Sequence, residues 1–376
     1  MQNILQGDCL EVMRTFPDNH FSCVVTDPPY GLHFMGKDWD GRIPAIEYWQ
    51  EALRVCKPGS HLLAFGGSRT HHHLMCAIEG AGWEIRDCIM WIYGSGFPKS
   101  HNHFGFKGYG TALKPAYEPI IVAMKPLDGT FAQNAEKWGV AGINIDECRI
   151  GTDQITTQLR DRSAWHGNRF GNGGYEKPIG ESEPRTGRWP ANIILDEIAG
   201  EMLDQQSGIL KSGQPGIRRK AHHTNSMSGR LNLTGNIENG IGDSGGASRF
   251  FYCAKASSAE RNAGLEGMPD KIGGGMCSTV SGDTRSGHIT IQKNNHPTVK
   301  PLKLMEYLIK LVMPPKDGIV LDPFAGSGTT IVAAKRLGFS AVGIEKSEEY
   351  AKIARARVDA VEIEQEQLDL FEAYGT

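Results

Sequence analysis

Short, mainly apolar runs alternate along this chain with longer segments in which apolar residues recur every three or four positions. Runs of the first kind predict strands buried on both faces of a parallel sheet, and they occupy residues 21–26, 61–65, 120–123, 319–321 and 341–344. Segments of the second kind predict helices, and they occupy residues 45–56, 69–79, 301–312, 329–337 and 347–358. The alternation predicts a doubly wound α/β sheet, whose ligands bind beyond the carboxyl ends of the strands.

This periodicity fades between about residues 126 and 250. Residues 207–246 contain nine glycines among Ser, Asn and Thr, a composition that favours loops over packed helices. The short runs 142–146 and 188–196 predict strands or strand edges, and residues 196–203 predict a short helix. We expect an insertion into the α/β sheet here rather than an independent domain.

Composition agrees with one large core and an appended smaller region. The chain has 376 residues, of which 39% are hydrophobic and 22% charged. No run reaches the roughly 18 apolar residues of a membrane span, and residues 1–4 lead into a strand-like segment without a signal peptide, so we expect a cytoplasmic protein. The eight cysteines form no CxxC pair, which favours buried reduced thiols over disulfides or zinc ligands.

Charge is unevenly distributed along the chain. The formal net charge is −3, yet residues 205–256 contain seven Lys or Arg against two acids. This surplus predicts a phosphate-facing surface, and its candidate contacts are Arg218, Arg219, Lys220 and Arg230. Beyond Val358 there are six acids and no Lys or Arg, so the C-terminal tail is expected to point away from any nucleic acid.

Two motifs with distinct chemistry follow two of the predicted strands. Asp27-Pro28-Pro29-Tyr30 comes directly after residues 21–26, and the segment 322–328, Asp-Pro-Phe-Ala-Gly-Ser-Gly, comes directly after residues 319–321. An acid followed by two stiff prolines presents fixed acceptors to an amino group, whereas a glycine-rich strand-to-helix turn lets the backbone approach a nucleotide-like cofactor. Taken singly, the first motif also suits a helix N-cap followed by helix-starting prolines.

In this order the two motifs resemble those of the β-class DNA amino-methyltransferases, in which DPPY precedes FxGxG and a target-recognition region lies between them. Further similarity lies at residues 7–9, 296–301 and 343–345, so the resemblance covers about residues 1–125 and 290–358. It implies a permuted Rossmann-like methyltransferase sheet with an inserted target-recognition region. The implied division is a catalytic half in 1–125, a glycine-rich recognition region in 126–289 and a cofactor half in 290–376.

The resemblance implies methyl transfer from S-adenosyl-L-methionine to a base amino group in double-stranded DNA. Hydrogen bonds to the Asp27 carboxylate and the Pro28 carbonyl would draw the amino nitrogen toward tetrahedral geometry, while Tyr30 would stack on the flipped-out base. The implied catalytic residues are Asp27, Pro28, Pro29 and Tyr30. The implied cofactor-binding residues are Asp8, Cys9, Asp27, Thr298, Lys300, Asp322, Pro323, Phe324, Gly326, Ser327, Gly328, Thr329, Glu345 and Lys346.

The target base follows from the same comparison. Enzymes of this class that methylate N6 of adenine usually have Asp before the two prolines, whereas those that methylate N4 of cytosine usually have Ser, although the usage overlaps. We therefore expect an adenine-N6 enzyme, with a cytosine-N4 enzyme as the alternative and an RNA or protein amino-methyltransferase as a more distant one. A homodimer and a cognate restriction endonuclease are further partners that the resemblance suggests.

Several of these residues have a structural alternative. Asp8 and Glu345 also suit helix caps, and His296 suits a structural turn better than catalysis. Trp91, Tyr93 and Phe97 suit either a base pocket or the core.

Two other nucleotide sites and a metal site are disfavoured. A dinucleotide-binding fingerprint needs a glycine at position 331, which is Ile331, and a P-loop needs a lysine before Thr329. The consecutive His71, His72 and His73 point in different directions from a helix, so they are not expected to share a metal ion.

Overall fold

The computed structural model describes residues 2–32, 40–96, 100, 105–155, 158–160, 178–181, 185–211, 243–254, 262–266, 271–272, 291–292, 294, 296, 299–315 and 317–361. The chain forms two compact units, of which the first comprises residues 1–148, 192–199 and 253–376 and the second residues 149–191 and 200–252. The predicted division at residues 125 and 289 stays a prediction.

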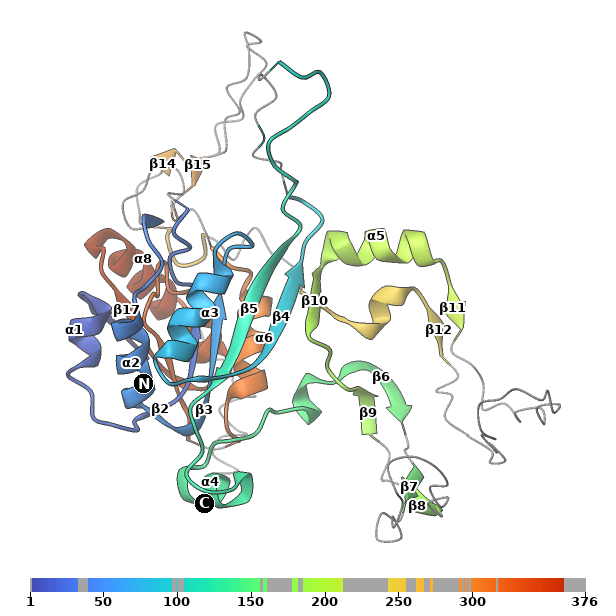
Figure 1. The fold of residues 1–376 in the computed structure, drawn as a ribbon, viewed down its shortest axis with the longest axis horizontal. Helices are drawn as coiled ribbons and strands as arrows, with labels where there is room; N and C mark the ends of the chain where they lie inside the picture. Colours follow the sequence, from blue (N-terminus) through green and yellow to red (C-terminus); the bar gives the residue numbers. More distant parts are fainter. Residues whose placement is uncertain are drawn as a thin grey trace, which may run out of the picture. The chain divides into compact units, whose positions relative to one another are not determined.

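A nine-stranded sheet forms the centre of the first unit within the described residues (Figure 1). The order of its strands is β1 (Gln2–Gln6), β17 (Ser340–Glu345), β16 (Ile319–Asp322), β2 (Phe21–Thr26), β3 (Cys56–Phe65), β5 (Tyr117–Met124), β4 (Glu84–Ile92), β10 (Ile193–Asp196) and β13 (Tyr252–Ala254). Strands β1, β17, β16, β2 and β3 are mutually parallel. The apolar runs predict this direction for β17, β16, β2 and β3, whereas β1 is not among the predicted runs.

Strand β5 corrects one expectation about this sheet. Residues 120–123 are predicted to form a parallel strand, but β5 runs antiparallel to both of its neighbours, β3 and β4. The chain crosses from β3 to β4 through helix α3 (His71–Gly80), and β5 then fills the space between them from the opposite end. An apolar run indicates burial on both faces of a sheet but carries no information about strand direction. The sequence pattern is therefore compatible with a parallel or an antiparallel strand.

Helices cover both faces of the sheet. Helices α1 (Cys9–Met13), α2 (Ile46–Val55) and α3 share one apolar core with Val24 of β2 and Leu62 of β3. The next residue back along β2, Cys23, points to the opposite face and donates from its Sγ to Met313 Sδ at 3.3 Å, just beyond α6 (Leu302–Val312). Helix α7 (Thr329–Arg336) packs against α6, and α8 (Glu348–Asp359) packs against α7. The five predicted helices are thus confirmed, with ends that differ by one or two residues.

The expected strand at residues 142–146 is wrong. The segment is a turn that leads into a short 3₁₀ helix, η3 (Asp146–Cys148), after helix α4 (Phe131–Trp138). Its backbone bonds to a helix instead of a strand, because the Asn144 amide donates to the Leu311 carbonyl of α6 at 2.9 Å. The predicted run 188–196 splits between β9 (Arg185–Arg188) and β10, and the short helix predicted at 196–203 is α5 (Glu197–Ser207).

The second unit consists of small antiparallel strand pairs joined by polar contacts. The pairs are β6 (Ile150–Ile155) with β9, β7 (Gln158–Arg160) with β8 (Pro178–Glu181), and β11 (Leu210–Lys211) with β12 (Ser244–Gly245), followed by η4 (Ala247–Phe250). In the first unit, β14 (Lys271–Ile272) pairs with β15 (Ile291–Gln292) apart from the nine-stranded sheet.

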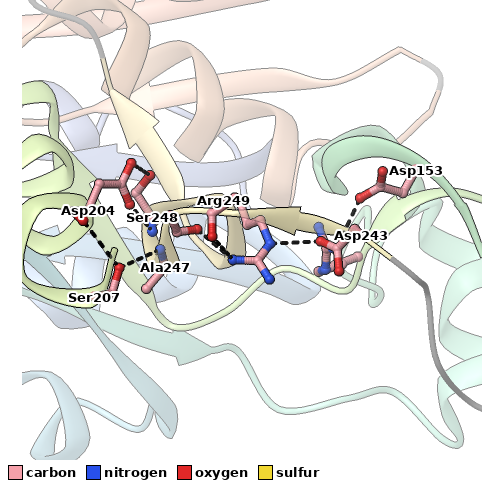
Figure 2. Close-up of polar contacts among 10 residues, drawn as sticks. Asp153, Asp204, Ser207, Asp243, Ala247, Ser248 and Arg249 are labelled. Atoms are coloured by element: carbon pink, nitrogen blue, oxygen red, sulfur yellow. Dashed lines mark hydrogen bonds and ion pairs between the residues drawn. The ribbon is translucent and has the colours of Figure 1, made fainter. Parts of the chain in front are cut away.

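Helix α5 holds η4 through hydrogen bonds, as Figure 2 shows. The Asp204 carboxylate accepts from both the amide and the hydroxyl of Ser248 at 2.8 Å, and the Ser207 hydroxyl accepts from the Ala247 amide at 3.0 Å. These bonds satisfy backbone donors that a 3₁₀ turn leaves without partners.

Ion pairs in the same unit change the interpretation of its basic charge. Asp243 binds Arg249 at 2.7 Å and also binds Arg188, which lies 3.0 Å from Asp153 (Figure 2). Arg249 is one of the seven basic residues counted between 205 and 256, and its charge is balanced within the protein. Lys211 is exposed on β11. The four predicted DNA contacts, Arg218, Arg219, Lys220 and Arg230, lie outside the described residues, as does Lys255.

Two broader expectations can be compared with the described part of the chain. The seven cysteines described there are all free thiols, and Cys9, Cys23, Cys56 and Cys148 are buried. In that same part of the chain, no helix has the length and apolar character needed to cross a bilayer.

Candidate active site

The two sequence motifs meet at the point where the strand order of the sheet reverses. From β16 the chain continues to β17 on one side, and from β2 it continues to β3 on the other. Asp322 ends β16 and Asp27 follows β2, so both acids lie at the carboxyl ends of adjacent parallel strands. The Thr26 hydroxyl donates to Asp322 Oδ1 at 2.6 Å and ties the two strand ends together. Ligands of doubly wound sheets bind at such a switch point.

A cavity of about 1420 Å³ opens at this edge of the sheet. Pockets for one drug-sized ligand span about 300–1,000 Å³, so this cavity has room for a nucleoside cofactor together with a second ligand. The predicted site residues that line it are Asp8, Cys9, Asp27, Pro28, Pro29, Tyr30, Lys300, Asp322, Pro323, Phe324, Gly326, Ser327, Thr329, Glu345 and Lys346. Gly328 is not among the lining residues, and Thr298 lies outside the described residues.

Asp27 is at the centre of a polar cluster within the cavity. The Tyr30 hydroxyl donates to Asp27 Oδ1 at 2.7 Å, and Lys300 Nζ donates to Asp27 Oδ2 at 2.7 Å. Glu118, near the start of β5, accepts from the Tyr30 hydroxyl at 3.0 Å and lies 3.2 Å from Lys300 Nζ. Lys300 is predicted to be a cofactor contact, and in the structure its ammonium group binds the carboxylate of the predicted catalytic acid.

The cluster has a distinctive electrostatic balance. Burial raises the pKa of Asp27, and the neighbouring Glu118 raises it further, while the Lys300 ammonium opposes both. Burial by itself lowers the pKa of Lys300, but the carboxylates of Asp27 and Glu118 outweigh burial and raise it. The ammonium also lies 4.9 Å from the centre of the Phe65 ring and 5.4 Å from that of Tyr30. Lys300 is therefore held as a cation against Asp27.

The loop after Asp27 is fixed by a carboxylate that the motif does not contain. Asp40 accepts from the amides of Tyr30 at 2.6 Å and Gly31 at 3.0 Å through Oδ1, and from the Leu32 amide at 3.2 Å through Oδ2. Asp40 is only 2% exposed, so these charge-assisted bonds form away from water. Asp40 thus sets the course of the backbone at Tyr30.

The glycine-rich turn is also held from outside its own motif. Arg357 of α8 is buried and donates to the Ser327 carbonyl at 2.7 Å, the Ser327 hydroxyl at 3.1 Å and the Thr329 hydroxyl at 3.0 Å. Gly328 has φ +80°, in the left-handed region, and packs against Ala354 of α8. Arg357 and Ala354 therefore attach the turn to α8.

Gly326 is constrained by a histidine as well as by its backbone. Its φ is +53°, and a Cβ at this position would lie 2.8 Å from His296 Nε2. The His296 ring packs edge-on against Tyr350, with ring centres 4.6 Å apart. This contact agrees with the structural role expected for His296. The position of the ring leaves no room for a side chain at residue 326, in addition to the predicted approach of a cofactor.

The DNA methylase family profile, which covers N6 and N4 enzymes, matches residues 21–356. The chain belongs to this family. S-adenosyl-L-methionine is the cofactor of this family.

Curated relatives match this chain over a short part of their own length. Type II methyltransferase M2.DpnII of Streptococcus pneumoniae is 52% identical over 65 residues, which is 17% of this chain and 24% of that protein. Type II methyltransferase M.ScaI of Streptomyces caespitosus is 42% identical over 81 residues, 22% of this chain and 25% of that protein. The chain thus spans about a quarter of the length of the curated relatives it matches.

Solved structures align over most of the chain at low identity. The M1.HpyAVI–SAM complex aligns with 95% of this chain and 98% of its own at 17% identity and a TM-score of 0.40. The cytosine-N4-specific PvuII DNA methyltransferase aligns with 99% of this chain and 91% of its own at 16% identity and a TM-score of 0.46.

The cavity suits S-adenosylmethionine on its cofactor side. Gly328 is the N-cap of α7 and has no side chain to cap the helix, which leaves N–H groups of its first turn for a carboxylate. Glu345 ends β17, and its carboxylate accepts from the amides of Gly326 at 2.8 Å and Ser347 at 2.7 Å. A carboxylate has about four acceptor sites, so these two bonds leave capacity for ribose hydroxyls.

The structure shows a helix-capping contact at Asp8 and places two of the three aromatic residues in the cavity. Asp8 caps α1 by accepting from the Leu10 amide at 3.1 Å, and it pairs with Lys346 at 3.2 Å. Trp91 and Tyr93 line the cavity with ring centres 5.5 Å apart, and Phe97 lies outside the described residues. Glu118, Asp40 and Arg357 are the contacts that sequence reasoning missed, because each is a single charged residue outside a recognisable motif.

Proposed function

We propose that this chain is a site-specific DNA methyltransferase that acts on the N6 amino group of adenine. The observation that supports this proposal most directly is the position of Asp27 within one cavity that it shares with the glycine-rich turn and Glu345. Family membership supports an amino-methyltransferase, and the Asp-Pro-Pro-Tyr sequence favours adenine over cytosine. Cytosine N4 is the alternative target, and an RNA or protein amino group is a more distant one.

The chemistry required of the protein is modest. S-adenosylmethionine supplies, when bound, a methyl group on a sulfonium centre that is already activated for transfer. The amino nitrogen of adenine is a poor nucleophile because its lone pair is delocalised into the ring. Asp27 accepts a hydrogen bond from that amino group and, with the Pro28 carbonyl, orients its lone pair away from the ring plane.

Asp27 also suits the final loss of a proton. Once the nitrogen has four bonds, one of its N–H protons must leave. Burial raises the pKa of Asp27 above that of an exposed aspartate, so its carboxylate is a better acceptor for this proton.

The substrate and partners follow from this proposal. The target is double-stranded DNA with the base flipped into the cavity, whose volume of about 1420 Å³ admits both base and cofactor. Residues 205–256 are proposed to face phosphates, through Arg218, Arg219, Lys220 and Arg230. A cytoplasmic location, a homodimer and pairing with a restriction endonuclease are part of the same proposal.

Single-molecule sequencing of DNA from cells expressing the gene tests the proposal. We expect N6-methyladenine in a recurring short sequence, and no modification in cells expressing Asp27→Asn. Recurrent N4-methylcytosine would show that the target base is wrong. Unmodified DNA, together with methylation of RNA or protein by the purified chain, would refute the DNA substrate.

A further inference from the structure

Glu118 and Lys300 surround Asp27, yet neither has a part in the methyl transfer proposed above. Glu118 lies on the antiparallel strand β5 and Lys300 lies just before α6. The Lys300 side chain is 8% exposed and that of Glu118 is 24% exposed. Charged side chains at this depth are costly unless they are paired, which calls for a reason for both of them.

The four groups form a closed network of short contacts. Lys300 Nζ donates to Asp27 Oδ2 at 2.7 Å and to the Tyr30 hydroxyl at 3.1 Å, and it lies 3.2 Å from Glu118. A tyrosine hydroxyl has a single proton, so at any moment it donates to one carboxylate only. Its two acceptors, at 2.7 and 3.0 Å, belong to Asp27 and Glu118.

Glu118 therefore offers Tyr30 and Lys300 a second carboxylate. When an amino group approaches Asp27, the Tyr30 hydroxyl can donate to Glu118 without losing a hydrogen bond. Lys300 stays fixed between the two acids and against the Phe65 ring. The charge on Asp27 is thereby kept in place while its Oδ1 becomes available to the target base.

We propose that Glu118 and Lys300 are positioning residues of methyl transfer, Lys300 by holding the Asp27 carboxylate and Glu118 by holding Lys300 and the Tyr30 hydroxyl. This inference rests on the proposed function, because it acts through Asp27. It adds a distinct expectation about pH. Asp27 is faced by Tyr30, Lys300 and Glu118, and by Asp322 at the end of β16, and the first three carry the network.

The signs of the two charges predict opposite shifts. The Lys300 ammonium favours the ionised form of Asp27, whereas the Glu118 carboxylate disfavours it. Single-turnover methylation of duplex DNA, at saturating enzyme and S-adenosylmethionine, should fall on the acid side as Asp27 becomes protonated. Lys300→Met should move this acid limb to higher pH, and Glu118→Gln should move it to lower pH. At a pH on the acid limb, the rate changes about tenfold for each pH unit of movement.

Matched variants separate positioning from folding. Lys300→Arg retains the positive charge and should return the acid limb toward that of the wild type. Lys352→Met and Glu348→Gln remove the same charges from an exposed pair at 2.7 Å on α8, and they should leave the acid limb in place. Calorimetry should show that S-adenosylmethionine still binds to Glu118→Gln, which confirms that the fold of the cavity is intact.

The outcomes distinguish this inference from the proposed function. Opposite shifts of the acid limb in Lys300→Met and Glu118→Gln would support the positioning role. Unshifted limbs, or shifts in the same direction, in variants of an enzyme that does methylate DNA would overturn it. A wild-type protein that leaves DNA unmethylated would instead refute the proposed function.

Discussion

Replacing Gly326 by alanine tests the structure of the glycine-rich turn. The backbone of Gly326 has φ +53°, a conformation that costs an L-residue about 1–2 kcal/mol. A Cβ would also lie 2.8 Å from His296 Nε2 and 3.1 Å from Cε1, so the ring must move against Tyr350. Overpacking of this kind costs about 1–3 kcal/mol. We therefore expect Gly326→Ala to lower the free energy of unfolding by about 2–5 kcal/mol, measured by urea unfolding.

Gly139 offers a matched control for the backbone contribution. It ends α4 with φ +74°, and a Cβ there would meet nothing within 4 Å. Gly139→Ala should thus show the left-handed cost of about 1–2 kcal/mol alone. The double variant Gly326→Ala with His296→Ala removes the crowded ring, and the effect of the glycine substitution should then fall to that of Gly139→Ala.

The same substitution should weaken cofactor binding. Displacing the turn breaks the bond from the Gly326 amide to Glu345 Oε2, which is 2.8 Å long. Glu345 is then no longer held in place to accept from the ribose hydroxyls. Hydrogen bonds to charged groups contribute about 1.5–3 kcal/mol, so the loss of one such bond to the cofactor corresponds to roughly 10- to 100-fold in the dissociation constant of S-adenosylmethionine. Calorimetry measures this constant, and Gly139→Ala should leave it unchanged. Equal effects of the two glycine variants on stability and on affinity would refute the reasoning.

Three further predictions concern catalysis, pH and DNA. Asp27→Asn keeps an acceptor for Lys300 but removes the negative charge. Turnover should fall by about 10²–10³-fold with unchanged cofactor affinity, and near-normal methylation would contradict the catalytic role of Asp27. Burial raises the pKa of Asp322 from 3.8 to about 6, so this group stabilises the fold below pH 4 and that stabilisation is lost as pH rises through about 6. Relative to Asp322→Asn, the wild type should lose up to about 3 kcal/mol over this pH range in denaturant unfolding, and parallel pH curves would argue against it. Replacing Arg218, Arg219 and Lys220 by Ala should weaken binding to all DNA duplexes alike. The slope of log affinity against log salt concentration should become shallower by about 0.9 per lost phosphate contact, and an unchanged slope would show that DNA binds to another surface.

Local sequence determined much of the catalytic edge. The Asp-Pro-Pro-Tyr and glycine-rich motifs directly follow strands, and parallel strands place their carboxyl ends at one edge of a sheet, so the meeting of Asp27 and Asp322 could be predicted. The five helices could be predicted for the same reason, because their periodicity is a property of neighbouring residues.

Tertiary structure alone decided the direction of β5 and the partners of the catalytic acid. Lys300 lies 273 positions from Asp27, and Glu118 lies 88 positions from Tyr30, so no local pattern links them. Glu118 reaches Asp27 because β5 runs antiparallel, which places the beginning of that strand beside the ends of its neighbours. Asp40 and Arg357 are single charges whose importance arises from the backbone groups they meet after folding. The sequence gives the type of each side chain. Charge pairing depends on the distance between side chains, and that distance is set only when the strands assemble into the sheet.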